Sequence, residues 1–386
     1  MGRVTHNVFL MKIVIDKDIP FIKEVLEKHA EVVYLKGSSI SKTDVLDADA
    51  LIIRTRTKCN AVLLEGTKVR FIASATIGYD HIDVDFCRSH NIRWTNAEGC
   101  NSSSVQQYVA AALFHLANKL NFELAQKTIG VVGVGHVGTK VAKLCESLGM
   151  RALLNDPPRE RREGAAAFVS LDTIVEQADI LTLHVPLNYE GEDKTYHLVD
   201  EKFLSRLHEH QILINTSRGE VADTKALKSS LKERKLAACV LDVWENEPGI
   251  DLELLDRVDI GTPHIAGYSA DGKANGTAMS VQALSRFFGF GLDGWFPKHI
   301  PVPENTTLEV DCANVNQQQV IGRLIHQTYD IMSDDFRLRS SPHTFEQQRS
   351  EYPLRREFPS CTVKLLNANH DVASIIQKIG FRVSGS

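Results

Sequence analysis

The chain has 386 residues, of which 43% are hydrophobic, 24% charged and 7% aromatic, and these values exclude a disordered or collagen-like chain. Its 49 acidic and 44 basic residues give a net charge of −5, so no basic field is available to hold a nucleic acid. The seven cysteines include no Cys-x-x-Cys pair, and no run of about 18 apolar residues predicts a membrane helix. We therefore expect a cytoplasmic protein of two or three domains, without a disulfide framework, a metal site or a membrane segment.

The first quarter of the chain alternates short apolar runs with helix-like segments, which predicts βαβ units and a parallel sheet. The apolar runs lie at residues 12–16, 32–34, 51–53 and 71–73. A helix is expected at residues 105–120, where apolar residues recur at helical spacing. The polar side chains of residues 101–104 are expected to cap its start, and the helix leads into a second domain.

A second βαβ series predicts a doubly wound domain, because runs typical of buried strands are separated by helical stretches. These runs lie at residues 128–134, 152–155, 180–185, 212–215, 239–243 and around Ile260. An amphipathic helix is predicted at residues 274–288, and glycines and prolines then mark a domain boundary. The last segment keeps a strand-like run at 362–366 and an apolar helix near 372–379, so we expect a small folded module there.

A glycine-rich turn stands between a predicted strand and a predicted helix, as a dinucleotide-binding G-x-G-x-x-G motif requires. Gly133 allows the tight turn, Gly135 lets the backbone approach a pyrophosphate, and Gly138 brings helix and strand close together. His136 and Val137 complete the turn, next to the N–H groups that the helix start presents to the anion. The alternative is that glycines stand in this turn only because strand and helix pack closely there, without any role in cofactor binding.

Asp156 ends the next predicted strand, 18 residues after Gly138, where the motif places an acidic residue on the adenosine ribose hydroxyls. A carboxylate disfavours a 2′-phosphate, so we expect NAD as the cofactor. Arg159 lies three residues further and suits such a phosphate, which keeps NADP as the alternative.

Three loops place a polar residue at the end of a predicted strand, where open α/β sheets bind their ligands. They are residues 215–219, 241–248 and 261–267. Oxidation of a 2-hydroxy acid needs a base for the hydroxyl proton, a cation for the carboxylate and a carboxylate that orients the base. His264, Arg218 and Glu247, one in each loop, supply these three catalytic roles.

These loops and the glycine motif together resemble the D-isomer-specific 2-hydroxyacid dehydrogenases. The matching segments read Asn-Thr-Ser-Arg-Gly, Asp-Val-Trp-Glu-Asn-Glu-Pro and Thr-Pro-His-Ile-Ala-Gly, in the family's order within about residues 11–290. Residues 156–159, 259–268 and 352–358 are similar to the branch that oxidises 4-phospho-D-erythronate to 2-oxo-3-hydroxy-4-phosphobutanoate with NAD, in pyridoxal 5′-phosphate biosynthesis.

The resemblance implies an α/β fold with two doubly wound parallel-sheet domains and a small C-terminal α+β domain. A flavodoxin-like substrate-binding domain is expected at residues 11–102 plus about 276–295, and a Rossmann NAD-binding domain at 103–275. Residues 296–386 are expected to form a dimerisation domain, which implies a homodimer. The resemblance also assigns Thr55, Thr76 and Tyr268 to the substrate, and Asp242 and Gly267 to the cofactor.

Two basic clusters suit a phosphorylated substrate. Arg54, Arg56 and Lys58 flank a predicted strand end and either grip a phosphate or form a solvated edge. Arg355 and Arg356 either reach a phosphate across a dimer or, as we expect, form a surface pair.

Two alternatives to this function stay open. One is another phosphorylated 2-hydroxy acid as substrate, such as 3-phosphoglycerate, because the three catalytic residues are shared by such enzymes. The other is a non-catalytic protein that senses NAD(H), because a fold alone does not establish turnover.

Overall fold

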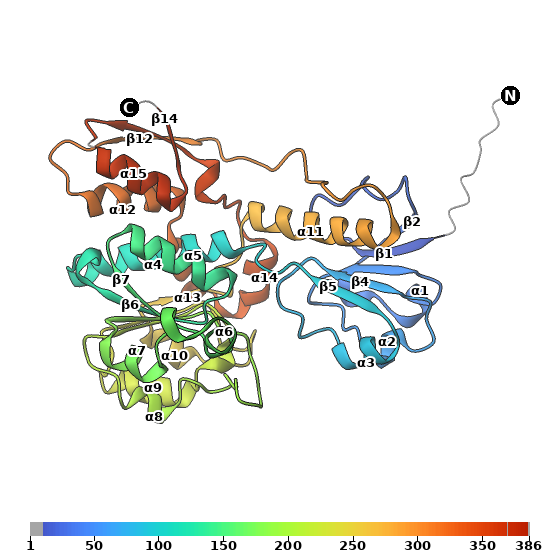
Figure 1. Ribbon diagram of the computed structural model, residues 1–386, viewed down its shortest axis with the longest axis horizontal. Helices are drawn as coiled ribbons and strands as arrows, with labels where there is room; N and C mark the ends of the chain where they lie inside the picture. The colour runs from blue at the N-terminus through green and yellow to red at the C-terminus, as the bar shows by residue number, and fades with distance from the viewer. Residues whose placement is uncertain (1–10, 369, 385–386) are drawn as a thin grey trace. The chain divides into compact units, whose positions relative to one another are not determined.

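The computed structural model describes residues 11–368 and 370–384, which form two compact units (Figure 1). Unit 1 contains the described residues up to Asn101 together with Ala270–Pro301. Unit 2 contains Ser102–Ser269 and the described residues from Val302 onward. Within the residues described, no helix combines the length and apolar character that crossing a membrane requires.

Unit 1 is built on a five-stranded parallel sheet whose order, 2-1-3-4-5, is that of flavodoxin-like folds. Across the sheet the strands are β2 (Glu31–Leu35), β1 (Lys12–Asp16), β3 (Ala50–Ile53), β4 (Phe71–Ser74) and β5 (Arg93–Asn96). The helices are α1 (Lys42–Val45), α2 (Ala61–Leu64), α3 (Val84–Ser89) and α11 (Ala270–Phe288).

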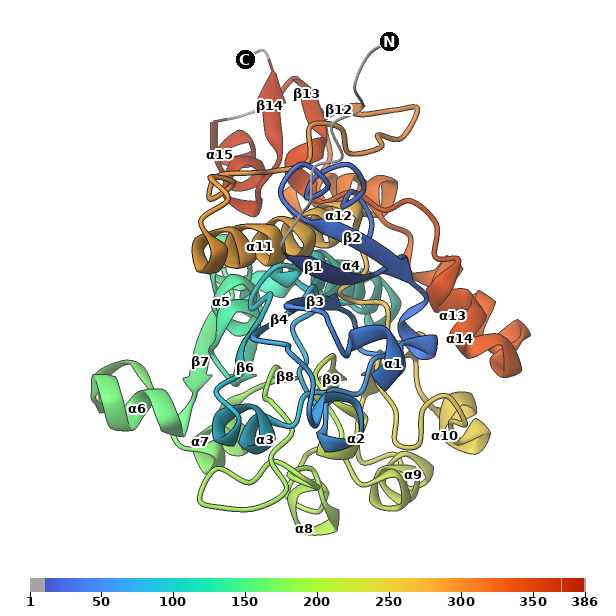
Figure 2. The ribbon, with the colours of Figure 1, turned by 90° about the vertical axis from the view of Figure 1, so that its right-hand side faces the viewer.

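The two faces of this sheet are covered by different parts of the chain (Figure 2). Val14 and Leu51 pack toward the side of α1, α2 and α3, while Ile13 and Ile52, which point the opposite way, pack against Leu284 of α11. Side chains alternate in this way because successive residues of a strand point to opposite faces. The unit 1 core is therefore completed by a helix from far along the sequence.

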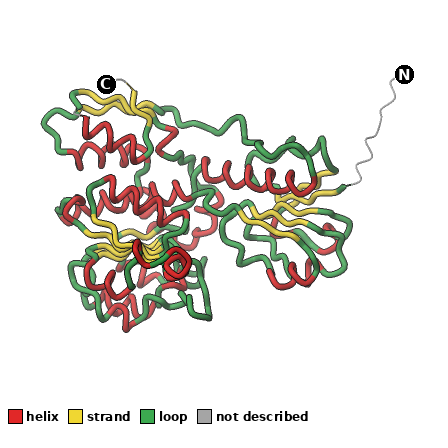
Figure 3. Tube along the Cα trace, viewed as in Figure 1, coloured by secondary structure: helices red, strands yellow, loops and turns green. Residues whose placement is uncertain are grey.

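Unit 2 contains a six-stranded parallel sheet with helices on both faces (Figure 3). In order across the sheet the strands are β11 (Ile260–Gly261), β10 (Ala238–Leu241), β9 (Ile212–Asn215), β8 (Ile180–Leu183), β6 (Thr128–Val132) and β7 (Arg151–Asn155). The helices are α4 (Ser102–Leu120), α5 (His136–Ser147), α6 (Pro157–Glu163), α7 (Leu171–Gln177), α8 (Glu201–Leu204), α9 (Thr224–Lys232) and α10 (Leu252–Arg257). The strand order reverses between β6 and β8, and a ligand is expected beyond the carboxyl ends of the strands there.

The segment after Val302 adds a three-stranded parallel sheet and further helices to unit 2. The sheet consists of β12 (Thr307–Asp311), β13 (Thr362–Leu366) and β14 (Arg382–Ser384). The helices are α12 (Gln317–Thr328), α13 (Ile331–Ser340), α14 (Phe345–Ser350) and α15 (His370–Ile379). Apolar residues of β12, β13, α12 and α15 join one core with α4 and α5, so these elements pack on the helices that cover one face of the six-stranded sheet (Figure 1).

The predicted α/β class, with one flavodoxin-like and one Rossmann-like sheet, is confirmed. The predicted strand at 212–215 has the bounds of β9, and the strand predicted at 128–134 ends earlier because Gly133 turns the chain. The expectation that residues 101–104 cap the long helix is wrong, because Ser102 to Ser104 already form the first turn of α4. Short 3₁₀ turns lie at Gly37–Ser39, Leu124–Gln126, Ala165–Ala167, Gly219–Val221, Pro342–Thr344 and Phe358–Ser360.

Candidate active site

Arg218, Glu247 and His264 gather at one edge of the unit 2 sheet. Each follows one of three adjacent strands, β9, β10 and β11, whose carboxyl ends point the same way because the sheet is parallel. All three line a pocket of about 440 Å³. Its lining also includes Tyr189, Tyr196, Gly219, Glu220, Trp244, Glu245 and Asn246.

Glu247 and His264 form a close acid–imidazole pair in this pocket. The Nδ1 atom of His264 lies 2.8 Å from Oε2 of Glu247, and the other carboxylate oxygen accepts the backbone N–H of Trp244 at 3.0 Å. Burial opposes ionisation, but the His264 charge and hydrogen bond and the Trp244 amide outweigh it, so the pKa of Glu247 lies below its ordinary value. The carboxylate thus fixes the imidazole through Nδ1 and leaves Nε2 for a substrate hydroxyl.

The loop that carries His264 is held by the buried side chain of Asp242. One carboxylate oxygen accepts the Thr262 hydroxyl at 2.6 Å and the Ile265 N–H at 2.7 Å, and the other accepts the Ala266 N–H at 2.8 Å. His264 itself has a φ of 56°, and its N–H bonds the Asp242 carbonyl at 2.7 Å. Burial raises the pKa of the Asp242 carboxyl. These bonds hold His264 in a left-handed backbone conformation that non-glycine residues rarely adopt.

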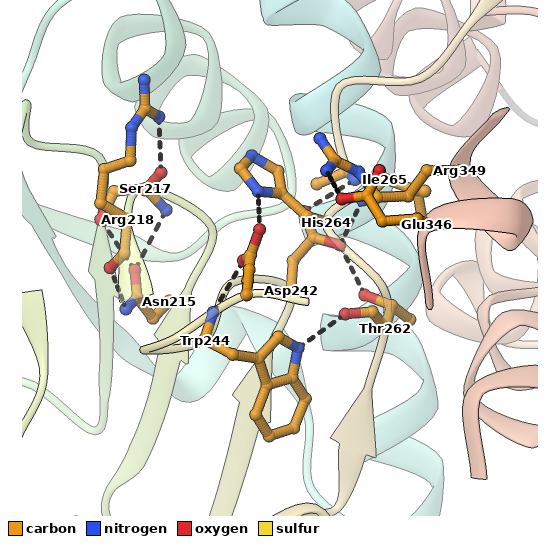
Figure 4. A network of polar contacts seen from close by, with 12 residues as sticks. Asn215, Ser217, Arg218, Asp242, Trp244, Thr262, His264, Ile265, Glu346 and Arg349 are labelled. Carbon is orange, nitrogen blue, oxygen red and sulfur yellow. Dashed lines mark hydrogen bonds and ion pairs between the residues drawn. The ribbon is translucent and has the colours of Figure 1, made fainter. Parts of the chain in front are cut away.

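Arg218 projects from a loop shaped by the buried side chain of Asn215 (Figure 4). The Asn215 amide oxygen accepts the N–H and the hydroxyl of Ser217, and its nitrogen donates to the Arg218 carbonyl at 2.9 Å. The guanidinium donates to the Ser217 carbonyl at 2.8 Å. Figure 4 shows Arg218 and His264 extending in the same direction from neighbouring loops.

Several pocket residues were missed by the sequence analysis. Tyr189 and Tyr196 follow β8, with ring centroids 5.2 Å apart, and Glu245 binds Nε2 of His197 at 2.8 Å. Because β8 is also a strand whose carboxyl end faces this edge, the rule that selected the other loops would have selected this one. His184, which follows β8, is half-buried, and burial lowers its pKa to about 3.

The glycine turn has the geometry that a dinucleotide motif needs. Gly133 has a φ of 87°, and a Cβ on Gly138 would lie 2.0 Å from the Gly133 carbonyl oxygen, so a side chain has no room there. No atom lies within 4 Å of the position of a Cβ on Gly135, which leaves open space in front of this backbone. His136 and Val137 form the first residues of α5, whose N-terminal N–H groups suit a pyrophosphate.

Asp156 follows β7 and begins α6, where its carboxylate accepts the N–H of Arg159 at 3.0 Å and of Val134 at 2.8 Å. The guanidinium of Arg159 is already engaged. It donates to the Val134 carbonyl at 2.6 Å and pairs with Glu163 at 2.7 Å. The arrangement therefore fits a ribose beside Asp156 and does not favour a 2′-phosphate on Arg159.

The remaining predicted site residues are divided between the two units. Thr55 and Thr76 belong to unit 1, where they follow the neighbouring strands β3 and β4, and Thr76 bonds the Ser74 hydroxyl at 2.8 Å. Tyr268 and Gly267 belong to unit 2, and Tyr268 packs edge-on against Tyr352 with 5.9 Å between centroids.

The expected surface pair of arginines is wrong for Arg355, which is only 5% exposed. Arg356 is half-buried. In unit 1, Arg56 and Lys58 are exposed at the end of β3, and Arg54 donates to the Asp18 carbonyl at 3.1 Å.

Comparison with known proteins identifies the class. Residues 101–266 match the family described as D-isomer specific 2-hydroxyacid dehydrogenase, NAD binding domain, and residues 300–380 match Domain of unknown function (DUF3410). D-lactate dehydrogenase from Aquifex aeolicus, solved with NAD and lactic acid, is 26% identical with a TM-score of 0.58, covering 75% of this chain and 100% of that one. The NAD⁺-bound 3-phosphoglycerate dehydrogenase of Entamoeba histolytica is also 26% identical, with a TM-score of 0.62 and coverage of 75% and 99%. The fold and the class are thus those of the NAD-dependent D-2-hydroxyacid dehydrogenases.

Curated relatives narrow the assignment within this class. Erythronate-4-phosphate dehydrogenase of Bacteroides fragilis is 51% identical over 348 residues, which cover 90% of this chain and 97% of the relative. The enzymes of that name from Porphyromonas gingivalis and Proteus mirabilis are 44% and 41% identical, each covering at least 96% of this chain and 100% of the relative. The chain belongs to the erythronate-4-phosphate dehydrogenase family of D-isomer-specific 2-hydroxyacid dehydrogenases. The family resemblance and the expected NAD cofactor are therefore confirmed.

Proposed function

We propose that this protein oxidises 4-phospho-D-erythronate to 2-oxo-3-hydroxy-4-phosphobutanoate with NAD, as a step of pyridoxal 5′-phosphate biosynthesis. The observation that carries the proposal is the pairing of His264 with Glu247 at 2.8 Å in a pocket that Arg218 also lines. It is supported by the names of relatives up to 51% identical over nearly the whole chain.

The three pocket residues divide the work of the reaction. Arg218 binds the substrate carboxylate, because a guanidinium fork matches its two oxygens. His264 accepts the C2 hydroxyl proton at Nε2, while Glu247 holds Nδ1 and stabilises the imidazolium that results. As this proton leaves, the C2–H bond breaks and C2 becomes a carbonyl. Bound NAD supplies the hydride acceptor for this step.

The glycine turn and Asp156 hold the cofactor. The N–H groups of His136, Val137 and Gly138 would bind the pyrophosphate at the open space beside Gly135, and Asp156 would bind the ribose hydroxyls. We assign Asp242 and Gly267 to the nicotinamide side of the same site.

We also assign two hydroxyl residues of unit 1, Thr55 and Thr76, to the substrate; they follow the neighbouring strands β3 and β4. The basic side chains of Arg54, Arg56 and Lys58 in the same unit suit a phosphate. Tyr268, in unit 2, is likewise assigned to the substrate.

We further propose a cytoplasmic homodimer that associates through residues 296–386. Exposed apolar side chains of this segment, such as Phe336 (72% exposed) and Leu354 (46%), support an interface there. The seven cysteines are all free, which suits a reducing compartment.

The test is NADH formation by the purified protein with 4-phosphoerythronate and, separately, with 3-phosphoglycerate. A 2-oxo acid is added in parallel to reoxidise any NADH that stays bound. Strong preference for 4-phosphoerythronate is expected, and preference for 3-phosphoglycerate would retain the chemistry but change the substrate. Binding of NAD without turnover of either acid would favour an NAD(H)-sensing protein.

A further inference from the structure

Arg355 is a buried cation in the segment that matches the domain of unknown function. Among the described residues, every hydrogen bond of its side chain is made by one nitrogen, Nη2. This atom donates to the carbonyl oxygens of Ile265 at 3.1 Å and Ala266 at 2.6 Å, and to the Ser104 hydroxyl at 3.2 Å. The two carbonyls belong to the residues directly after His264.

The same two peptide groups are held from their other side by Asp242. Its carboxylate accepts the N–H groups of Ile265 and Ala266, whose carbonyl groups point to Arg355. Asp242, a buried anion, thus accepts from the N–H groups of this dipeptide, and Arg355, a buried cation, donates to its carbonyl groups. Charge-assisted hydrogen bonds are stronger than neutral ones, so this dipeptide has little freedom to move.

Among the residues that the structure describes, none forms a direct ion pair with Arg355. Its Nε and Nη1 atoms are buried without a hydrogen-bond partner among the described residues, and the guanidinium lies over the Tyr329 ring, 4.4 Å from the centroid. Burial opposes the charge of this guanidinium, but the groups around it outweigh that cost and raise the pKa of Arg355 above its ordinary value, so the charge is kept. Two of its three hydrogen bonds go to the loop of His264.

Residues next to Arg355 form hydrogen bonds to the segment that follows His264 and to α4. The side chain of Glu357 accepts the Ser269 hydroxyl at 2.9 Å, and the Arg356 carbonyl accepts the Gln107 amide at 3.0 Å. Residues 355–357 therefore form a strap that holds the 265–269 segment against α4, all within unit 2.

We propose that Arg355 is a positioning residue of the dehydrogenase: its guanidinium holds the carbonyls of Ile265 and Ala266 and so keeps His264 where Glu247 can orient it. This inference rests on the proposed function, because it assigns His264 as the base. The proposal also gives residues 300–380, which match the domain of unknown function, a role in the dehydrogenase reaction.

The first test needs no turnover. Hydrogen exchange is compared in wild type, Arg355→Met and Arg339→Met, a matched control whose guanidinium also donates to two carbonyls, those of Leu255 and Val258. Exchange of the Ile265 and Ala266 amides should rise at least about tenfold in Arg355→Met alone, because their carbonyls lose their partner. Unchanged exchange at both amides would overturn the proposal.

The second test is kinetic. In Arg355→Met kcat should fall about 10- to 100-fold, the cost of a base displaced by about 1 Å, while KM for NAD changes little. Arg355→Lys, which keeps the charge, should recover part of kcat. In a His264→Gln background Arg355→Met should cost nothing more, because its effect passes through His264.

The outcomes separate the two proposals. A fall in kcat of Arg355→Met that persists in the His264→Gln background, or an unchanged kcat, would refute the positioning role. If Arg355→Met does not fold, Arg355→Lys decides, and wild-type exchange and kcat in that variant would refute it. If the wild type oxidises no 2-hydroxy acid, the proposed function fails, while hydrogen exchange still tests the hold of Arg355 on the loop.

Discussion

Replacing Glu247 by glutamine should change which imidazole nitrogen of His264 carries the proton. The side chain faces two groups: the Trp244 N–H, which is always a donor, and Nδ1 of His264. A carboxylate accepts from both, but a glutamine has one oxygen and one NH₂ group. The oxygen must face Trp244, so the NH₂ group faces Nδ1 and requires it to be an acceptor.

The proton of a neutral His264 then resides on Nε2, the nitrogen that must accept the substrate proton. An amide in place of the carboxylate of a Ser-His-Asp triad imposes the wrong tautomer in the same way and lowers kcat about 10⁴-fold. Glu247 is 19% exposed, so water partly competes for Nδ1 and a loss of about 10³- to 10⁴-fold is expected, or about 4 to 5.5 kcal/mol in the activation barrier.

The assay is NADH formation at saturating substrate and NAD. Glu27→Gln is the matched control, because Glu27 accepts backbone N–H groups and the Tyr34 hydroxyl in unit 1 and is not among the residues that line this pocket. The control should retain wild-type kcat. A folded Glu247→Gln protein with kcat within about tenfold of wild type would show that the tautomer of His264 is not set by Glu247.

Three further predictions concern the carboxylate site, the cofactor and pH. Arg218→Ala should raise KM for the hydroxy acid and lower kcat. Arg218→Lys keeps the charge but not the forked guanidinium, so its kcat/KM should lie between those of Arg218→Ala and wild type. Equal kcat/KM in all three proteins would contradict the assignment. Gly135→Val should abolish NADH binding, measured by fluorescence titration, because the valine side chain would occupy the open space in front of the turn. An unchanged Kd for NADH would show that the cofactor binds elsewhere. Because the folded pKa of Glu247 is lowered, its ionised form stabilises the folded state above its ordinary value of 4.5, and this contribution is lost as the pH falls through the lower folded value. Urea unfolding should therefore show the stability advantage of wild type over Glu247→Gln shrinking below about pH 4.5, and an advantage that stays constant into more acid solution would refute the linkage.

Much of the fold was predictable because parallel strands buried on both faces are continuous apolar runs. Residues 212–215 are such a run, and the strand has these bounds. The gathering of Arg218, Glu247 and His264 was predictable for a related reason: each residue follows a strand, and the carboxyl ends of adjacent parallel strands share one edge.

What was missed depends on contacts between distant residues. Arg355 stands in a polar stretch and looks like a surface residue, but its carbonyl partners lie about 90 residues earlier in the chain. Tyr189 and Tyr196 belong to the loop after β8, which the strand-end rule would have selected, but no periodicity within this loop marks these two side chains as the ones that border the pocket. Serine favours the position just before a helix, but Ser102 to Ser104 lie inside α4, where the packing of the helix overrides that preference.

The way unit 1 is assembled has a consequence for its synthesis. The sheet face that includes Ile13, Ile52 and Phe71 is covered by Val281 and Leu284 of α11. At roughly 5–20 residues per second, the ribosome needs about 10–40 s to add the 192 residues from the end of β5 at Asn96 to the end of α11 at Phe288. During that interval the N-terminal sheet presents an uncovered apolar surface, which is a natural substrate for chaperones, and unit 1 can reach its native core only after most of the dinucleotide-binding fold has been made.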